Sequence, residues 1–197
     1  ILGNKIIRET MALIDARLPA GWKRRSFESP RSGKLFRPYS ICEIQEPGGK
    51  ASRLVIEARA AIEPRDVPFL KEQIETDIRA TGPGVTPLIV SLFLSRSVRQ
   101  RLTEAGISYA DSTGNMRIVS AFPALYIETP GADINPNKKN RPARSLKGAK
   151  AGRIVRALCD ALPPFSTRKL AETVGVNAGY LSRVMRFLES EGLIERR

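Results

Sequence analysis

The C-terminal part of the chain, residues 149–197, carries three short helical patterns in a fixed order, and this order constrains the fold more than any other feature. The first pattern covers about residues 152–162 and is stopped by two prolines, which cannot continue a helix. The second opens at Ser166 or its neighbour, both good N-cap residues, and is closed by Gly175. The third opens at the strong N-cap residue Asn177, and its apolar residues recur at the spacing of one buried helix face: Leu181, Val184, Met185 and Leu188.

A short turn at residues 174–177 joins the second and third patterns, and its glycine permits a sharp change of direction. We therefore expect two helices that meet at this turn, the later one with a polar and basic face opposite its apolar face. The exposed candidates lie on that face or at the start of the two helices: Arg168, Lys169, Asn177, Gly179, Tyr180, Ser182, Arg183 and Arg186.

This stretch resembles the winged helix-turn-helix domains of bacterial transcription regulators. The match rests on residues 166–184, STRKLAETVGVNAGYLSRV, then on Leu188-Glu189 and on residues 191–194. The resemblance implies that the helix at 177–191 enters the major groove of double-stranded DNA, with Arg183 as the candidate for a bidentate contact to guanine. It also implies base or phosphate contacts for Asn177, Tyr180 and Ser182. For Arg168 and Lys169 it implies contacts to the phosphate backbone of the DNA. A winged-helix module that contacts only proteins is the alternative.

The ends of the sequence bear on this resemblance. Leu193 and Ile194 are expected to begin an extended segment, and the chain ends at Arg197, where the first strand of a wing should be under way. The sequence starts with Ile1 rather than methionine. We therefore expect a piece of a longer protein with the wing truncated.

Positive charge is concentrated near the C-terminus. The chain has a net charge of +13, of which residues 137–197, with 14 Lys and Arg against 5 Asp and Glu, supply +9. Such a bias attracts polyanions through the release of counterions. The preceding connector, 133–150, has no periodicity and is either a solvated linker or an arm that follows the phosphate backbone. Its basic candidates are Lys138, Lys139, Arg141 and Arg144.

Composition excludes several classes of site and protein. The chain contains no histidine, which removes the usual general base at neutral pH and the commonest transition-metal ligand. No apolar run reaches 18 residues, so we expect no membrane span. The two cysteines, Cys42 and Cys159, predict buried, reduced thiols in a cytoplasmic protein, and a bridge between them is the less favoured alternative. A DNA-binding protein of this kind is expected to be nucleoid-associated. We expect no cofactor and no bound metal.

Residues 1–132 alternate between helical and extended patterns. The nearly continuous apolar run at 87–94 is typical of a central strand buried on both faces. These patterns predict an α/β fold in which a mixed sheet is flanked by helices. The expected helices cover 4–18, 64–80 and 96–105, and the expected strands cover 22–28, 39–45, 52–61, 87–94, two segments within 107–119, and 124–129.

This order of elements resembles the restriction-endonuclease-like fold of the PD-(D/E)xK nucleases. The resemblance implies an aspartate and an acidic-x-lysine triplet that together hold Mg²⁺. Here Tyr39 stands in place of the aspartate, and Glu57-Ala58-Arg59 stands in place of the triplet. Glu43 or Glu9 could supply a second carboxylate, but we expect Glu57 and Arg59 to form a structural charge pair and the site to be inactive.

The segment GISYADSTGN at 106–115 combines polar residues with glycine and asparagine. Asp111, Thr113 and Asn115 could form a polar site, but a turn needs the same composition, and we favour the turn. Together with the VIEAR and PLIVSLFLS strands and the SLKGAKAGRIVRAL segment, it resembles actinobacterial helix-turn-helix regulators that pair a nuclease-like domain with a winged helix.

The sequence thus predicts a nuclease-like domain at 1–132, a basic linker at 133–150 and a winged helix-turn-helix at 151–197. The expected function is sequence-specific binding of double-stranded DNA by a transcription regulator. The rival functions are a Mg²⁺-dependent nuclease and an antitoxin-like autoregulator. A homodimer and a further protein partner are left open.

Overall fold

The computed structural model describes residues 2–28, 39–81, 84–136, 146–160 and 166–195. The contacts within the chain divide it into two compact units, Ile1–Pro136 and Asn137–Arg197. We refer to them as the N-terminal unit and the C-terminal unit and describe each by itself.

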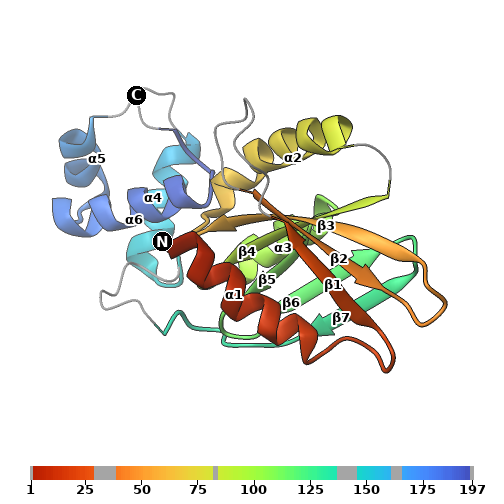
Figure 1. Ribbon diagram of the computed structural model, residues 1–197. Helices are drawn as coiled ribbons and strands as arrows, with labels where there is room; N and C mark the ends of the chain where they lie inside the picture. The colour runs from red at the N-terminus through yellow and green to blue at the C-terminus, as the bar shows by residue number, and fades with distance from the viewer. Residues whose placement is uncertain (1, 29–38, 82–83, 137–145, 161–165, 196–197) are drawn as a thin grey trace. The chain divides into compact units, whose positions relative to one another are not determined.

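The N-terminal unit is built on one seven-stranded mixed sheet, in which the strands lie side by side in the order in which they occur in the chain (Figure 1). The pairs β3–β4 and β4–β5 are parallel, and the other neighbours are antiparallel. The strands are β1 (Lys23–Glu28), β2 (Tyr39–Gln45), β3 (Ala51–Arg59), β4 (Val85–Ser91), β5 (Ser108–Asp111), β6 (Met116–Ser120) and β7 (Leu125–Thr129).

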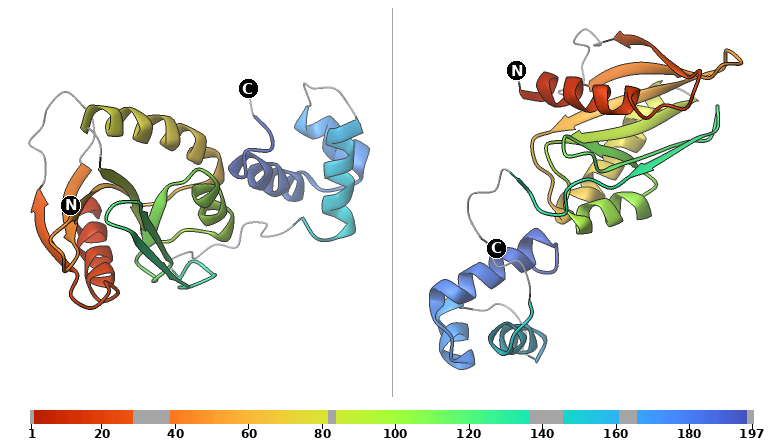
Figure 2. Two further views of the ribbon diagram at one scale, coloured as in Figure 1. Left: turned by 90° about the vertical axis from the view of Figure 1, so that its right-hand side faces the viewer. Right: turned by 90° about the horizontal axis from the view of Figure 1, so that it is seen from below.

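Helices cover both faces of this sheet (Figure 2). Helix α1 (Leu2–Asp15) packs on one face, and α2 (Val67–Thr81), with the short 3-10 helix Pro64–Asp66 before it, packs with α3 (Arg96–Glu104) on the other. The central strand β4 contributes to both cores, because successive side chains of a strand point to opposite faces. Leu88 and Val90 are buried against α1, while Ile89 is buried with α2 and α3. The predicted α/β sheet with a doubly buried middle strand is therefore confirmed.

The end of the central strand differs from its prediction. The apolar run at 87–94 suggested a strand to Leu94, but β4 ends at Ser91. Leu94 is fully buried in the core shared with α2 and α3, and its backbone N–H donates to the Asp111 carboxylate at 2.9 Å. Burial therefore continues past the end of the ladder, and hydrophobicity alone could not mark where the strand stops.

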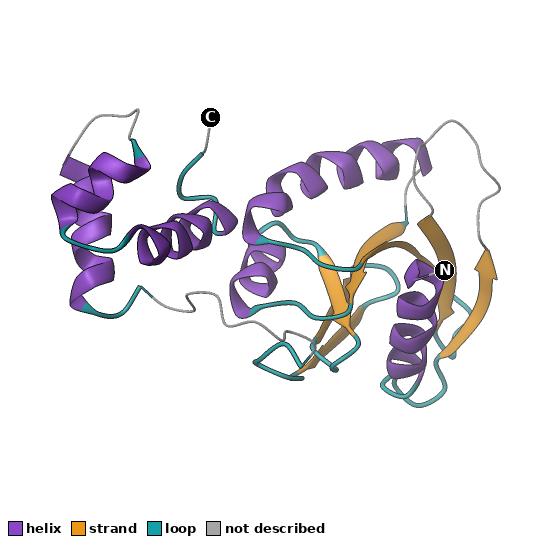
Figure 3. Cartoon of the chain, turned by 90° about the vertical axis from the view of Figure 1, so that its left-hand side faces the viewer, coloured by secondary structure: helices purple, strands orange, loops and turns teal. Residues whose placement is uncertain are grey.

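The C-terminal unit is a cluster of three helices, drawn with the other elements in Figure 3. Helices α4 (Ala149–Asp160), α5 (Thr167–Val174) and α6 (Ala178–Ser190) agree with the three expected helical patterns. Helix α4 begins three residues before the predicted start, and Leu146, in the expected linker, packs partly against the same core. The buried residues are Ile154, Leu170, Ala171, Val174, Leu181, Val184 and Leu188.

The segment after α6 departs from the prediction. Leu193 and Ile194 were expected to begin an extended wing strand, yet residues 191–195 form a turn and irregular backbone. Within the part of the chain that the structure describes, the C-terminal unit therefore contains helices and no wing. Among the same described residues, no helix is long and apolar enough to cross a membrane.

The two cysteines lie in different surroundings. Cys42 on β2 is buried, with its Sγ 4.0 Å from the Sδ of Met11, and burial raises the pKa of its thiol to about 12. Cys159 on α4 is exposed, so the expectation of two buried thiols is wrong for this residue, which lies on the outer side of an amphipathic helix.

This difference predicts selective thiol labelling. At pH 8 a maleimide should react with Cys159 in the folded protein, whereas Cys42 should react only after unfolding, because a buried thiol with a raised pKa presents almost no thiolate. Mass spectrometry of the labelled chain, with and without denaturant, measures this. Equal labelling of both thiols in the folded protein would contradict the packing of β2 against α1.

Candidate nucleic-acid interface

The arrangement of α5 and α6 follows from their caps and the turn between them. The Ser166 hydroxyl accepts from the backbone N–H of Lys169 at 3.4 Å, and the Asn177 side chain accepts from the N–H of Tyr180 at 2.7 Å. Between them Gly175 adopts the left-handed conformation with a φ of 64°, which a residue with a side chain rarely adopts. Both helices therefore start after the cap residue that the sequence predicted, and α5 ends at the predicted glycine.

Helix α6 separates an apolar face from a polar face. Leu181, Val184 and Leu188 are buried in the three-helix core. Gly179, Arg183 and Arg186 are exposed, and their spacing of four and three residues places them on one side of the helix. The structure therefore brings together three of the residues that the sequence analysis singled out on this helix, with Ser182 half-buried beside them. Tyr180, which was expected to be exposed, is half-buried and packs partly against the three-helix core.

The positive charges of the two arginines on this face are not neutralised by a carboxylate of the described residues. Among the described residues, neither Arg183 nor Arg186 forms an ion pair. The Arg183 guanidinium carbon lies 5.8 Å from the centre of the Tyr180 ring, within the range of a cation–π contact. Such a contact limits the conformations of the arginine without neutralising it.

The basic residues at the start of α5 differ from each other. Arg168 Nε lies 3.3 Å from the Glu172 carboxylate, but its side chain is 91% exposed, so this pair is weak. Lys169 is exposed in the same turn. Both residues lie in the first turn, where the free backbone N–H groups of a helix also attract anions. The predicted linker candidates Lys138, Lys139, Arg141 and Arg144 lie outside the described residues.

In the N-terminal unit, the acidic-x-basic triplet forms a charge pair. Arg59 Nε donates to the Glu57 carboxylate at 2.7 Å, and Arg59 Nη2 donates to the Gln73 side chain on α2 at 3.3 Å. Both members of the pair are half-buried. The guanidinium therefore occupies the neighbourhood of the carboxylate in which a second acidic residue would be needed to hold a metal ion.

The other candidate carboxylates do not meet Glu57. Backbone pairing places Tyr39 opposite Glu57, whereas Glu43 is opposite Arg53. Glu43 is therefore four residues further along the ladder, roughly 14 Å away at about 3.4 Å per residue. Glu9 lies on α1, which packs on the opposite face of the sheet, and pairs with Lys5 at 3.7 Å. Over the described residues, no group of three His, Cys, Asp or Glu side chains could hold a metal ion.

The polar segment at 106–115 is held together by Asp111. This fully buried carboxylate accepts hydrogen bonds from the backbone N–H groups of Leu94, Thr113 and Asn115 at 2.9, 2.9 and 3.1 Å. It also accepts from the Thr113 hydroxyl at 2.6 Å and from the Asn115 amide at 2.9 Å. These bonds use the acceptor capacity of the carboxylate to join the start of α3 to the β5–β6 turn, which agrees with the favoured interpretation as a turn.

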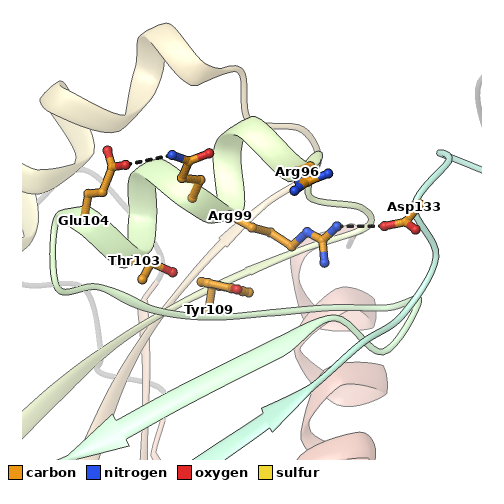
Figure 4. Close-up of a pocket in the computed structure, with 7 residues that line it drawn as sticks. Arg96, Arg99, Thr103, Glu104, Tyr109 and Asp133 are labelled. Carbon is orange, nitrogen blue, oxygen red and sulfur yellow. Dashed lines mark hydrogen bonds and ion pairs between the residues drawn. The ribbon is translucent and has the colours of Figure 1, made fainter.

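Asn115 extends this network to a shallow hollow of about 650 Å³ beside α3 (Figure 4). The Asn115 side-chain oxygen Oδ1 accepts from Arg99 Nη1 at 2.5 Å, and Arg99 Nη2 lies 3.1 Å from the Asp133 carboxylate. Sequence patterns gave no sign of this hollow, because its residues come from three separate segments. They are Arg96, Arg99, Gln100, Thr103, Glu104, Tyr109 and Asp133. The Arg99 charge is used within the protein, whereas Arg96 is exposed and forms no ion pair with a described residue.

Comparisons with known proteins add little to this picture. No protein-family model matches the chain, and no curated protein matches it. A solved structure of EndoMS in its apo form is similar over 51% of this chain, at 19% sequence identity and a TM-score of 0.33. The matched region spans 43% of that chain, less than half of its length. What the structure itself establishes is a mixed α/β unit with a seven-stranded sheet and a separate three-helix unit.

Proposed function

We propose that this protein binds double-stranded DNA in a sequence-specific manner and acts as a transcription regulator, with α5 and α6 as a helix-turn-helix. The observation that carries the proposal is the exposed face of α6, where Arg183 and Arg186 stand without ion pairs in the described chain. Arginines that are not neutralised within the protein are available to base edges and phosphates. A protein of this kind would be found with the nucleoid in the cytoplasm.

Four of the exposed residues have specific roles in this proposal. Arg183 is the candidate for a bidentate contact to O6 and N7 of a guanine, and the Tyr180 ring restricts its conformations. Arg168 and Lys169, in the first turn of α5, contact the phosphate backbone and set the position of the protein on the duplex. Asn177 uses its side-chain oxygen to cap α6, which leaves its amide group for a nucleic-acid contact.

We infer that the N-terminal unit has a restriction-endonuclease-like fold that serves as a binding platform without nuclease activity. Its order of one helix, three strands, a helix, a strand, a helix and three strands supports the fold. The Glu57–Arg59 pair, and the distance of Glu43 and Glu9 from it, support the absence of catalysis.

The test of the main proposal is selection of genomic fragments by the protein at near-physiological salt with Mg²⁺ present, followed by sequencing. A motif shared by enriched, uncut fragments is the expected result. Enrichment without any shared motif would reject sequence-specific binding, since a basic surface alone retains all DNA.

A second experiment addresses the nuclease alternative. Supercoiled plasmid incubated with the protein and Mg²⁺ should stay intact, and Glu57→Gln should leave DNA binding unchanged, because Glu57 is engaged by Arg59. Gel electrophoresis and a binding assay measure the two quantities. Cleavage that disappears in Glu57→Gln while binding persists would establish an active nuclease and overturn the inference.

A further inference from the structure

Strand β7 forms an outer edge of the seven-stranded sheet (Figure 1). Within the described residues only β6 pairs with it, so one side of β7 carries backbone N–H and C=O groups with no strand partner. Such an edge is a template for the addition of another strand. In natural proteins, such edge strands are either protected from further pairing by charged residues and irregular backbone, or they pair with a strand of another chain.

Exposed apolar side chains gather around this edge. Among the described residues of the N-terminal unit, four of the six exposed large hydrophobic residues fall between positions 119 and 134. They are Val119 on β6, Tyr126 on β7, Phe122 in the turn before β7, and Ile134 in the segment after it. Tyr126 and Phe122 are 61% and 59% exposed, and Lys50 Nζ lies 5.2 Å from the centre of the Phe122 ring.

The outward side chains of β6 and β7 form an ordered row. Arg117 is paired with Glu128 across the two strands, and Val119 is paired with Tyr126. The Arg117 guanidinium carbon lies 5.9 Å from the centre of the Tyr126 ring, and the Tyr126 hydroxyl donates to the Glu128 carboxylate. Along the exposed face of β7, the hydroxyl donor of Tyr126 is therefore followed by the carboxylate acceptor of Glu128.

We propose that β7 pairs in antiparallel fashion with β7 of a second copy of this chain, which joins the two sheets about a two-fold axis centred on Ile127. This register keeps the buried face continuous, because residues of the same parity stay on the same face. It places Tyr126 opposite the partner's Glu128, and Glu128 opposite the partner's Tyr126, so that the exposed row is complementary to itself.

The same register brings Phe122 to the interface. Antiparallel pairing sets the beginning of one β7 beside the end of the other. Phe122, three residues before β7, then lies at each end of the interface, where the partner's β7 ends. A second copy thus covers the apolar side chains at the edge without leaving a charged group opposite one of like sign.

The test compares two substitutions at one exposed position. Tyr126→Glu places a carboxylate opposite the partner's Glu128 at both symmetry-related positions, and this repulsion should shift the dimer to monomer. Tyr126→Lys places a positive charge opposite the same carboxylate and should keep the dimer. Sedimentation equilibrium of the full chain, over a range of concentrations, measures the mass. Phe69→Glu on α2, where the aromatic ring is 55% exposed, is the matched control and should leave the dimer intact.

Each outcome decides the proposal. A monomeric wild-type protein at all concentrations, or a dimer that persists in Tyr126→Glu, would overturn it. Loss of the dimer in both variants at position 126, with the fold retained by circular dichroism, would overturn the proposed register. Because the mass is measured without DNA, the result is independent of whether α6 binds DNA.

Discussion

Asp111→Ala is expected to lower the free energy of unfolding of the N-terminal unit by about 3–5 kcal/mol, since it removes a buried acceptor that serves several donors. The backbone N–H groups of Leu94, Thr113 and Asn115 would lose their partner inside the protein, where water cannot replace it. The start of α3 and the β5–β6 turn would then no longer be joined. Urea unfolding followed by circular dichroism measures the loss.

Asp133→Ala is the matched control. This aspartate belongs to the same network through Arg99, but its side chain is 87% exposed, so its removal should cost less than about 1 kcal/mol. Asp111→Asn should fall between the two, because the amide retains one acceptor oxygen and presents a donor to the remaining N–H groups. An Asp111→Ala protein as stable as the wild type would show that the carboxylate does not hold the turn.

Arg183→Ala is expected to weaken binding to a selected DNA site by about 1–3 kcal/mol, which is roughly 5–150-fold, and to weaken binding to random DNA much less. The reason is that a bidentate contact to a guanine exists only on the correct sequence, whereas the lost positive charge affects every sequence alike. Fluorescence anisotropy on the selected site and on a scrambled duplex, at the same salt concentration, separates the two effects. Arg183→Lys should restore the charge without the planar pair of donors, and so should recover little of the specificity.

Lys169→Ala is the comparison for a phosphate contact. It should weaken binding to both duplexes by a similar factor and reduce the slope of log affinity against log salt by about one. If Arg183→Ala gave this same uniform loss, Arg183 would be a phosphate contact, and the contacts to base edges would have to be assigned to other residues. The antitoxin-like alternative predicts instead a stable partner that co-purifies with the chain and depends on surfaces outside α6.

The dimer proposed at β7 and the DNA-binding proposal make separate predictions. If both hold, two copies of α6 act on one duplex, and the selected motif should contain two related half-sites in inverted orientation. A single asymmetric motif, together with a dimer that depends on Tyr126, would indicate that the two functions are not coupled.

Much of the C-terminal unit could be predicted from its sequence. Ser166 and Asn177 cap their helices with their own side chains, and Gly175 takes the left-handed conformation at the turn. The apolar period of α6 placed Leu181, Val184 and Leu188 in the core. In the N-terminal unit, the run at 87–94 likewise marked the strand that lies at the centre of the sheet.

Other features could not be predicted in this way. The composition of β2 and β3 did not reveal that Glu43 is opposite Arg53 rather than Glu57, because strand register depends on the whole ladder. The exposure of Cys159 depends on which side of α4 faces its neighbours. The hollow beside α3 and the link from Asn115 through Arg99 to Asp133 join segments that are far apart in the sequence.

By itself the sequence determined the caps, the turn, the apolar faces and the concentration of positive charge, since each of these depends on groups within a few residues of one another. Only the tertiary structure decided which charged groups meet. It placed a guanidinium, not a second carboxylate, beside Glu57, and it buried Asp111 among backbone donors. It also left Tyr126 exposed on an unpaired edge. The reason is that such contacts depend on strand register and on packing between distant segments, which no local pattern encodes.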